Sequence, residues 1–505
     1  MKYHVGTYSA LVIAFLITYS FQETKGQNAI IKIDTDRKIG EISPDIYGGF
    51  LEPIKEIVYG SLYDPESVYA DENGFRTDLI DLLKELKITN VRWPGGNYVS
   101  GYNWEDGIGP KDLRPARLDL AWKVIDKNQM GTDEYVKFCN LIGAKNFVCI
   151  NTGTGTLDQA RYWVEYCNVD QGTHYSDLRR KYTSEMPYNI KYWALGNEPD
   201  GWWQLGHKGV EDYCKFAKEA AKLMRQTDRN IKLIAAGASD YSPDKDWIGW
   251  NRNVLNNLVG YIDYLSMHRY IKSKDGFGET NNSFGEFMAL GCDLDQKIGI
   301  VKSQISEILV KSGSIRPIYI AFDEYTGQGV DLASSLMVAQ FLNAFIRHAE
   351  IVKIANYSFL TRLVSDSPDG HFKNAKYHSF YLFSNNCFGS SLDVYVDCEK
   401  YNTPRFENVP YLDVSSVYNE TDNLLIINVV NRHETSPISS VIELQKGEIE
   451  GSITISEVNG ASITSVNTSK EQNVSITTLE KKGKGKIMHH EFSAHSFTQI
   501  KLTLN

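Results

Sequence analysis

The chain has 505 residues, of which 42% are hydrophobic and 12% aromatic, which is enough for one large domain with a smaller one beside it. Its formal net charge is −10 and no basic block interrupts it, which argues against nucleic acid and anionic membranes as partners and favours a neutral ligand. The seven cysteines lack metal-ligand spacing, so we expect neither a metal site nor a disulfide framework.

The N-terminus has the pattern of a targeting segment. Lys2 precedes an apolar run at residues 10–17, and a polar stretch follows from about Gln22 to Gln27. The run is too short to span a membrane and is typical of a cleaved secretory signal. We therefore expect residues 1–26 to be a signal peptide and the mature chain to be periplasmic or extracellular, without a membrane anchor. The alternative is a buried N-terminal strand.

Buried strands and amphipathic helices alternate from residue 45 to residue 375. The expected strands are 46–52, 88–92, 147–151, 192–195, 232–237, 261–268, 318–322 and 351–357. The expected helices are 78–86, 133–142, 157–166, 210–226, 298–310 and 331–349. Eight strand–helix units in succession predict an α/β fold, the (β/α)8 or TIM barrel. An open doubly wound sheet is the alternative, but no strand leads into a glycine-rich phosphate loop, so we expect no cofactor.

After about Lys376 the composition changes. Helical patterns end, and short alternating runs bounded by Asn, Gly or Ser occupy 424–430, 438–444, 452–458, 474–478 and 497–504. This pattern is typical of an all-β sandwich. We expect the early strand at 29–34 to join it, so that residues 27–44 and 376–505 form a jelly-roll-like domain packed on the barrel.

Two of the predicted strands run directly into acidic residues. The stretch 191–201 reads KYWALGNEPDG, so its strand stops at Gly196 and leaves Asn197 and Glu198 at the carboxyl end; residues 317–325, PIYIAFDEY, lead into Asp323 and Glu324. Because the carboxyl ends of barrel strands meet at one face, we expect Glu198 and Glu324 to face one pocket. A carboxylate pair is what glycoside hydrolysis requires. The alternative is that each glutamate caps the helix or turn that follows it.

Other strand ends supply candidate sugar-binding groups. They are Glu52, Arg92, Asn97, Asn197, His268 and Tyr270. Such a set can hydrogen-bond several hydroxyls while two carboxylates flank one bond. Taken alone, Arg92 also fits a structural arginine that holds a carboxylate in its charged state, and His268 fits a simple hydrogen-bonding role. Trp202 and Trp203 are adjacent in a loop, so we expect one of them to border the pocket.

Long blocks of the barrel carry a family resemblance. They read RWPGGNYVSGYNWEDGIGP at 92–110, TGTGTLDQARYWVEYCN at 152–168, LGNEPDGWWQLGH at 195–207, SMHRY at 266–270 and FDE at 322–324. This set resembles glycoside hydrolase family 51, the retaining α-L-arabinofuranosidases. The resemblance implies a (β/α)8 barrel with a C-terminal β-sandwich. It also implies removal of non-reducing terminal α-L-arabinofuranosyl groups from plant polysaccharides or oligosaccharides, without a metal.

The resemblance further implies a role for each matched residue. Glu198 would be the general acid/base and Glu324 the nucleophile, with their carboxyl groups about 5 to 5.5 Å apart and Glu198 protonated at the start. The furanose would be contacted by Glu52, Asn97, Asn197 and Tyr270, and its floor would be shaped by Arg92 and Trp122. The resemblance also suggests a homo-oligomer, often a hexamer.

The sequence departs from the family pattern at three places. Glu52 is followed by Pro53 instead of histidine, and Glu324 is followed by Tyr325 and Thr326 instead of Trp-Asn. After strand eight, residues 355–359 read ANYSF, so an aromatic stands where the family has a glutamine. These changes leave the carboxylate pair intact but leave open which sugar and linkage are preferred. The alternatives are an endo-β-glucanase or β-xylosidase on the same scaffold, or a catalytically silent carbohydrate-binding protein.

Overall fold

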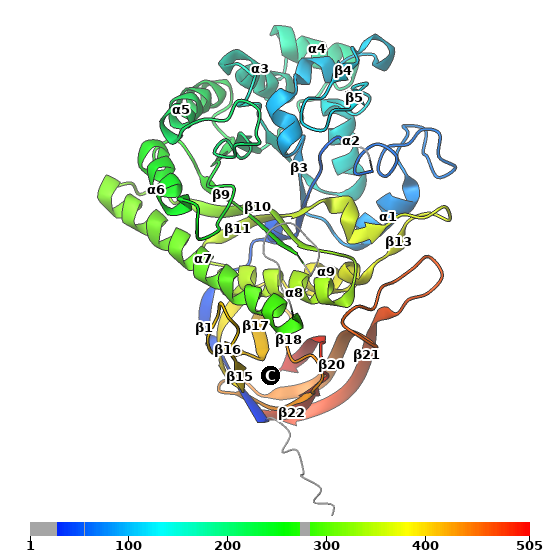
Figure 1. The fold of residues 1–505 in the computed structure, drawn as a ribbon, viewed down its shortest axis with the longest axis vertical. Coiled ribbons are helices and arrows are strands. Elements are labelled where there is room, and N and C mark those ends of the chain that lie inside the picture. The colour runs from blue at the N-terminus through cyan, green and yellow to red at the C-terminus, as the bar shows by residue number, and fades with distance from the viewer. Residues whose placement is uncertain (1–27, 55, 273–282) are drawn as a thin grey trace, which may run out of the picture.

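A computed structural model describes residues 28–54, 56–272 and 283–505 of the chain. The predicted signal peptide at 1–26 lies outside the described residues. Within them, the chain forms a barrel ringed by helices, with a curved β-rich domain packed at one end (Figure 1). In this described part, no helix combines the length and the apolarity that crossing a membrane requires.

Eight parallel strands close into a barrel in the order β10-β11-β2-β3-β6-β7-β8-β9. Their bounds are β2 Gly48–Phe50, β3 Asn90–Trp93, β6 Lys145–Cys149, β7 Tyr192–Leu195, β8 Lys232–Ala235, β9 Tyr264–Lys272, β10 Tyr319–Gln328 and β11 Val352–Ser358. The predicted barrel is confirmed. Its interior is filled by side chains such as Phe147, Tyr192, Ile234 and Ile354, so it is a packed core and not a channel.

Nine α-helices occur among the described residues. They are α1 Thr77–Glu85, α2 Thr132–Ile142, α3 Leu157–Asn168, α4 His174–Tyr182, α5 Val210–Thr227, α6 Trp247–Leu258, α7 Phe284–Ser312, α8 Leu332–Arg347 and α9 Ala375–Asn386. Six correspond to predicted helices, whereas α4, α6 and α9 were not predicted. The expectation that helices end at Lys376 was wrong, because α9 is buried around most of its surface and therefore lacks a one-sided apolar stripe.

Helix α8 joins the barrel to the β-rich domain. Every residue from Leu332 to Ile346 is buried, as expected for a helix enclosed on all sides. Its polar side chains find partners across the junction: Arg432 Nε donates to Gln340 Oε1 at 2.7 Å, and Asn343 Nδ2 donates to Asp413 Oδ2 at 2.8 Å. Arg432 also donates to Asp413 Oδ1 and to the carbonyl of Pro410, both at 3.0 Å. The junction is therefore hydrogen-bonded as well as apolar.

The β-rich domain is one sheet of nine strands in the order β21-β20-β23-β18-β17-β14-β1-β19-β22. The strands are β1 Asn28–Glu41, β14 Ser390–Asp397, β17 Leu412–Asn419, β18 Leu424–Asn431, β19 Ile438–Leu444, β20 Ile449–Gly460, β21 Val474–Gly485, β22 Ile487–Phe492 and β23 Phe497–Leu504. Strands from both ends contribute to one core, with Ile453 from β20 and Phe492 from β22 in the same cluster. The predicted second β domain is confirmed, and its sheet curls around that core.

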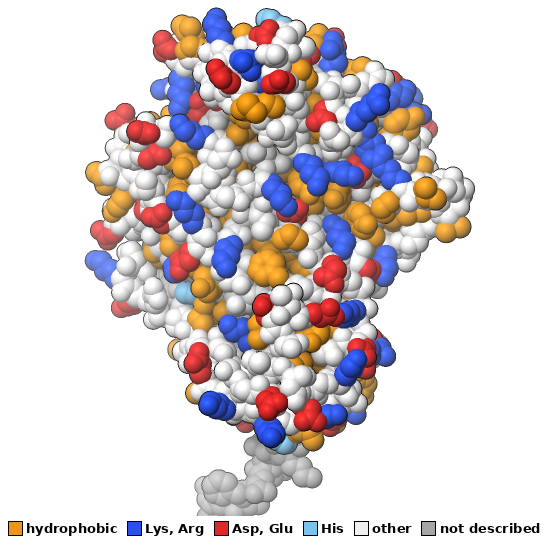
Figure 2. All heavy atoms as spheres, turned by 180° about the vertical axis from the view of Figure 1, so that it is seen from behind, with side chains coloured by type: hydrophobic (Ala, Val, Ile, Leu, Met, Phe, Trp, Pro, Cys, Tyr) orange, Lys and Arg blue, Asp and Glu red, His pale blue; other side chains and the backbone are white. Residues whose placement is uncertain are grey.

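Strand β1 opens the described chain but lies inside the C-terminal sheet. It pairs antiparallel with β14 and parallel with β19, so the two ends of the chain build one domain. The remaining strands form three short two-stranded ribbons: β4 Arg117–Leu118 with β5 Ile125–Asp126, β12 Val364–Ser365 with β13 Phe372–Lys373, and β15 Lys400–Tyr401 with β16 Val409–Pro410. All seven cysteines are free thiols. Acidic and basic side chains are interspersed over the face shown in Figure 2.

Candidate active site

Strands β9 and β10 are longer than the other barrel strands and carry several of the candidate site residues. The sequence predicted that β9 ends at His268 and β10 at Phe322, but the two strands stay paired as far as Lys272 and Gln328. The register of β10 shifts between Ala321 and Glu324 against β9. A bulge of this kind re-aims side chains next to active sites. Here it lets the consecutive residues Asp323 and Glu324 both reach the centre of the barrel mouth.

Both oxygens of Glu324 are held. Arg92 Nη1 donates to Oε1 at 2.6 Å, and the Tyr270 hydroxyl donates to Oε2. Arg92 has no exposed surface and also donates from Nη2 to Asn197 Oδ1 at 2.7 Å. Burial together with the charge of Glu324 raises the pKa of Tyr270 well above its usual range, so this side chain stays a phenol that donates its proton.

Glu198 lies in the tight turn after β7. Gly196 has φ +99°, and a Cβ added there would collide with Thr152 Oγ1. Glycine is therefore required for the chain to turn so sharply at the strand end. Glu198 itself adopts φ +44°. Its carboxylate is fixed on both sides, by His268 Nδ1 at 2.9 Å from Oε1 and by Trp203 Nε1, which donates to Oε2 at 2.9 Å.

The two glutamates predicted as a pair are neighbours. One oxygen of each lies within 4.8 Å of the other and of a ring nitrogen of His268. Such spacing would also suit a metal ion, but the three groups are already engaged in the hydrogen bonds given above. So close an approach of one oxygen from each group fits the spacing of about 5–5.5 Å in retaining glycosidases better than the about 6.5–9.5 Å of inverting enzymes.

His268 lies among three carboxylates. Its Nδ1 is 3.6 Å from Glu324 Oε2 and its Nε2 is 3.4 Å from Asp323 Oδ1. Burial opposes a charge on the ring, but Glu324, Asp323 and Glu198 outweigh it and raise the pKa of His268 well above its usual range. Burial alone would raise the pKa of Asp323, yet Arg92 and His268 lower it. The lowered pKa favours the charged form of Asp323, which pairs with both Arg92 and His268.

Glu52 follows β2 and lies near Glu324, since a Cβ added at Gly96 would be 3.2 Å from Glu52 Oε2 and 3.6 Å from Glu324 Oε1. Glu52 Oε1 accepts from the Tyr98 backbone N–H and from Trp122 Nε1, each at 2.8 Å. Burial raises the pKa of Glu52 to about 8, and the two hydrogen bonds oppose this without cancelling it. Trp122 belongs to the β4–β5 hairpin and is 40% exposed. The raised pKa favours the protonated form of Glu52 near neutral pH, and in this form the carboxyl group offers both a donor and an acceptor to a hydroxyl.

These groups open onto a cavity of about 600 Å³. Seven of the nine predicted site residues line it: Glu52, Asn97, Trp122, Glu198, His268, Tyr270 and Glu324. The other two, Arg92 and Asn197, are buried and bonded to each other beside the pair. The cavity is sized for a small neutral ligand.

Comparison with known proteins agrees with this site. An α-L-arabinofuranosidase 1 domain model matches residues 82–285, and an α-L-arabinofuranosidase C-terminal domain model matches 322–496. The probable α-L-arabinofuranosidase C of Aspergillus clavatus is 36% identical over 504 residues, covering 93% of this chain and 96% of that relative. The intracellular exo-α-(1→5)-L-arabinofuranosidase 1 of Bacillus subtilis is 35% identical, covering 80% and 84%.

Solved structures agree as well. The thermostable GH51 α-L-arabinofuranosidase of Thermotoga petrophila matches with a TM-score of 0.86 at 33% identity, over 94% of this chain and 100% of that one. The arabinose complex of the Thermotoga maritima α-L-arabinofuranosidase gives the same TM-score and identity, over 94% and 99%. The chain belongs to glycoside hydrolase family 51. A family 44 xyloglucanase of Paenibacillus polymyxa, with a TM-score of 0.62 at 14% identity, shares only the fold.

The strand-eight departure from the family 51 pattern falls inside the cavity. Phe359 lines it and stacks on Phe50, with ring centroids 5.1 Å apart. The guanidinium of Arg92 lies 5.1 Å from the Phe50 ring. In this family 51 member, the wall beside the carboxylate pair is therefore apolar.

Some residues of the candidate site were missed from the sequence. Asp323 adjoins Glu324, and its place in the FDEY run at the strand end was the available signal. The loop segment Ser239 to Ser242 also lines the cavity, but it carries no periodic pattern that would have marked it. Both Trp202 and Trp203 border the cavity, where only one was expected.

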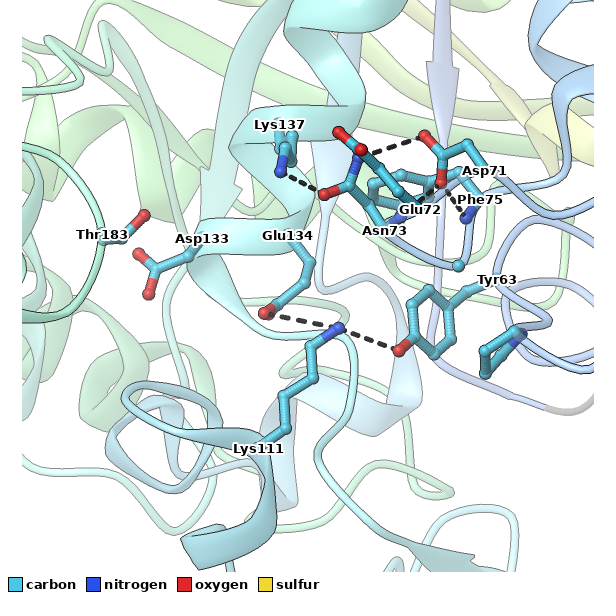
Figure 3. Close-up of a pocket in the computed structure, with 12 residues that line it drawn as sticks. Tyr63, Asp71, Glu72, Asn73, Phe75, Lys111, Asp133, Glu134, Lys137 and Thr183 are labelled. Carbon is cyan, nitrogen blue, oxygen red and sulfur yellow. Dashed lines mark hydrogen bonds and ion pairs between the residues drawn. The ribbon is translucent and has the colours of Figure 1, made fainter.

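A second cavity of about 430 Å³ lies on the flank of the barrel, between residues 63–75 and the start of α2 (Figure 3). Its charged groups pair with neighbours: Lys111 lies 3.8 Å from Glu134 and donates to the Tyr63 hydroxyl at 2.8 Å, and Lys137 donates to Asn73. None of the predicted family 51 site residues lines it. We therefore assign the chemistry to the barrel mouth.

Proposed function

We propose that this chain is a retaining, exo-acting α-L-arabinofuranosidase in which Glu324 is the nucleophile and Glu198 the general acid/base. The observation that carries the proposal is the pair of carboxylates within 4.8 Å at the barrel mouth, in a chain whose curated relatives are named α-L-arabinofuranosidases. Two adjacent carboxylates are needed for double displacement, whereas binding alone would not require them.

In the first step, Glu324 attacks the anomeric carbon while the bond to the leaving oxygen breaks. Glu198 transfers its proton to that oxygen, so the leaving sugar departs as a neutral alcohol and the arabinosyl group becomes an ester of Glu324. Arg92 and Tyr270 fix both oxygens of Glu324 beforehand. The nucleophile is therefore oriented before the substrate arrives, which lowers the entropic cost of reaching the transition state.

In the second step, water attacks the anomeric carbon from the side that the leaving sugar vacated. Glu198, now a carboxylate, takes a proton from the water, and the ester bond to Glu324 breaks. The two inversions give net retention. His268 and Trp203 hold the two oxygens of Glu198, so the same carboxyl group stays in place for both proton transfers.

The furanose would be held by the remaining predicted site residues. Asn197 Nδ2 is buried and has no hydrogen-bond partner among the described residues, so it is a donor ready for a ring hydroxyl next to the reacting carbon. Glu52, Asn97 and Trp122 line the same cavity as the two carboxylates. This set of polar groups supports a pocket for a single terminal sugar. Neither of the two steps described above uses a metal or cofactor.

The test is the initial rate on aryl α-L-arabinofuranoside, β-D-xyloside, β-D-glucoside and β-D-galactofuranoside, with Glu324→Ala as the blank. Preference for the arabinofuranoside supports the proposal down to the sugar. Proton NMR of the first product formed then reports its anomer. Activity confined to another sugar would overturn the specificity, and inversion at the anomeric carbon would overturn the roles given to the two glutamates.

We further propose that residues 1–26 direct export and are then removed. Residues 27–44 and 376–505 would form one β domain, and residues 45–375 the catalytic domain. The mature chain would form a homo-oligomer. Plant arabinan or arabinoxylan would be the exported enzyme's substrate. Relatives from Bacillus subtilis and Halalkalibacterium halodurans are named intracellular, so location is worth measuring directly. N-terminal sequencing of the protein from periplasmic and culture fractions tests export, and light scattering of the purified protein tests whether it is a hexamer.

A further inference from the structure

Glu198 lies between two groups of residues at the barrel-mouth cavity, one bonded to each of its carboxylate oxygens. On one side, His268 bonds to Glu198 Oε1 and leads to Glu324 and Tyr270. On the other side, Trp203 bonds to Oε2. Because the acid must stand at the oxygen between the two sugars, the side with Glu324 receives the sugar that is attacked. The side with Trp203 receives the sugar that leaves.

The leaving side is built from two loops fixed to each other. The Ser239 backbone N–H donates to Asp200 Oδ2 at 2.9 Å, which ties the loop after β8 to the loop after β7. Asp240 Oδ1 accepts from the Ser242 backbone at 2.9 Å and from its hydroxyl at 2.6 Å. The hydroxyl and carboxylate groups of residues 239–242 therefore form a pre-shaped polar wall along the cavity.

Trp202 lies in the loop after β7, two residues beyond Asp200, and lines the same cavity as residues 239–242. Its side chain is 82% exposed although it lines the cavity, and no aromatic side chain among the described residues is more exposed. Its ring lies edge-on to Trp203, with centroids 5.9 Å apart. An indole held in water at a cavity rim leaves a large apolar face uncovered. The C–H face of a pyranose or furanose ring is the surface that such a face covers.

We propose that Trp202 is the stacking platform for the sugar that carries the terminal arabinofuranose, and that it makes this enzyme selective for carbohydrate leaving groups. The inference rests on the proposed function, because it takes Glu198 as the acid. Trp202 would act on binding of the leaving sugar and not on the chemistry at the anomeric carbon. It is a specificity-determining residue and not a catalytic one.

The test compares two substrates that share the arabinofuranosyl group and differ in what leaves. Methyl α-L-arabinofuranoside has no sugar to stack, whereas α-1,5-linked arabinotriose does. In Trp202→Ala, kcat/KM on arabinotriose should fall about 30-fold, the loss expected for truncating a tryptophan anchor, while kcat/KM on the methyl glycoside stays within about twofold. Trp202→Phe should recover part of the loss on arabinotriose, since it keeps a flat ring.

A matched control is Tyr395→Ala, which removes a 58% exposed aromatic from the β-rich domain and should leave both rates unchanged. Equal losses on both substrates in Trp202→Ala would overturn the proposal, because they would mean that Trp202 acts by positioning Trp203 and Glu198. No loss on arabinotriose would also overturn it. If the wild-type enzyme hydrolyses neither substrate, the proposed function itself fails, and that result is visible before any variant is made.

Discussion

Two of the buried arginines lie among polar partners in contrasting places, Arg92 at the barrel mouth and Arg432 at the junction of α8 with the β-rich domain. At the junction, Arg432 uses Nε, Nη1 and Nη2 on three different partners. At the mouth, Arg92 is just as buried, but its neighbour Asn197 keeps a donor that has no partner among the described residues, and a cavity of about 600 Å³ lies beside it. A buried charge network that is fully satisfied stabilises a fold, whereas one that is left incomplete beside a cavity is prepared for a ligand.

The largest effect that this comparison predicts is at Glu324. Glu324→Gln should lower kcat by at least about 1,000-fold, because the amide cannot form the arabinosyl ester. The free energy of unfolding should fall by about 1–2 kcal/mol, since the amide oxygen can still accept one of the two hydrogen bonds and Asp323 still pairs with Arg92 Nε at 3.1 Å. Steady-state rates on an aryl arabinofuranoside and urea unfolding measure the two quantities. A large loss of stability would mean that the mouth is also a structural network.

The opposite result is expected at the junction. Arg432→Met removes one of the two arginines that pair with Asp413 Oδ1, since Arg347 Nη1 also lies 3.0 Å from it, and it leaves Gln340 Oε1 without its donor. The free energy of unfolding should therefore fall by about 2–3 kcal/mol, less than the about 3–5 kcal/mol that breaking an isolated buried pair costs. The folded fraction should keep the wild-type kcat, because the junction does not contact the cavity. Urea unfolding followed by tryptophan fluorescence gives the stability. If kcat fell together with stability, the two clusters would not be independent.

A smaller effect on kcat distinguishes a hydrogen bond to the proposed nucleophile from a nearby hydrogen bond that does not involve it. Tyr270→Phe removes the donor to Glu324 and should lower kcat about 10-fold to 100-fold, the range for a hydrogen bond to a charged group. Tyr357→Phe is the matched control, because its hydroxyl accepts from Thr326 at 2.8 Å inside the same end of the barrel. This control should leave kcat within about twofold. Equal losses in both variants would contradict a special role for Tyr270.

The smallest effect is a pH dependence at Glu52. Its pKa is raised from an ordinary value of 4.5 to about 8, so between these values the folded state binds more protons than the unfolded state. Stability from this group therefore falls as pH rises from about 5 to about 8. Glu52→Gln cannot titrate, so its unfolding free energy relative to the wild type should increase by about 1 kcal/mol or more across that interval. Urea curves for both proteins at the two pH values measure this difference, and no change in it would contradict the shift.

Much of this molecule followed from its sequence, and the misses have physical causes. Uninterrupted apolar runs such as 192–195 marked the barrel strands, because strands buried on both faces have no polar alternation. The extensions of β9 and β10 were missed, since polar residues such as Glu324 and Tyr270 do not look like strand interior. Helix α9 was missed because it is buried between other elements, where a one-sided pattern is not needed.

The residues of the candidate site were also predicted only in part. Glu198 and Glu324 were found because each follows an apolar strand, and a closed barrel brings such ends together. Asp323 was not predicted as a site residue because β10 alternation would turn it away from its neighbour Glu324, and only the register shift brings both to the mouth. The raised pKa of Glu52 depends on its burial in the folded barrel mouth, which no local pattern in the sequence records.

The most direct test of the two glutamate roles is to trap the intermediate. Glu198→Ala should still react with an aryl α-L-arabinofuranoside, because a good leaving group needs little protonation, but it lacks the base for the second step. The arabinosyl-enzyme should therefore accumulate, and peptide mass spectrometry should find the sugar on Glu324. An adduct on any other residue, or turnover of Glu198→Ala at the wild-type rate with no adduct, would contradict the roles assigned to the two carboxylates.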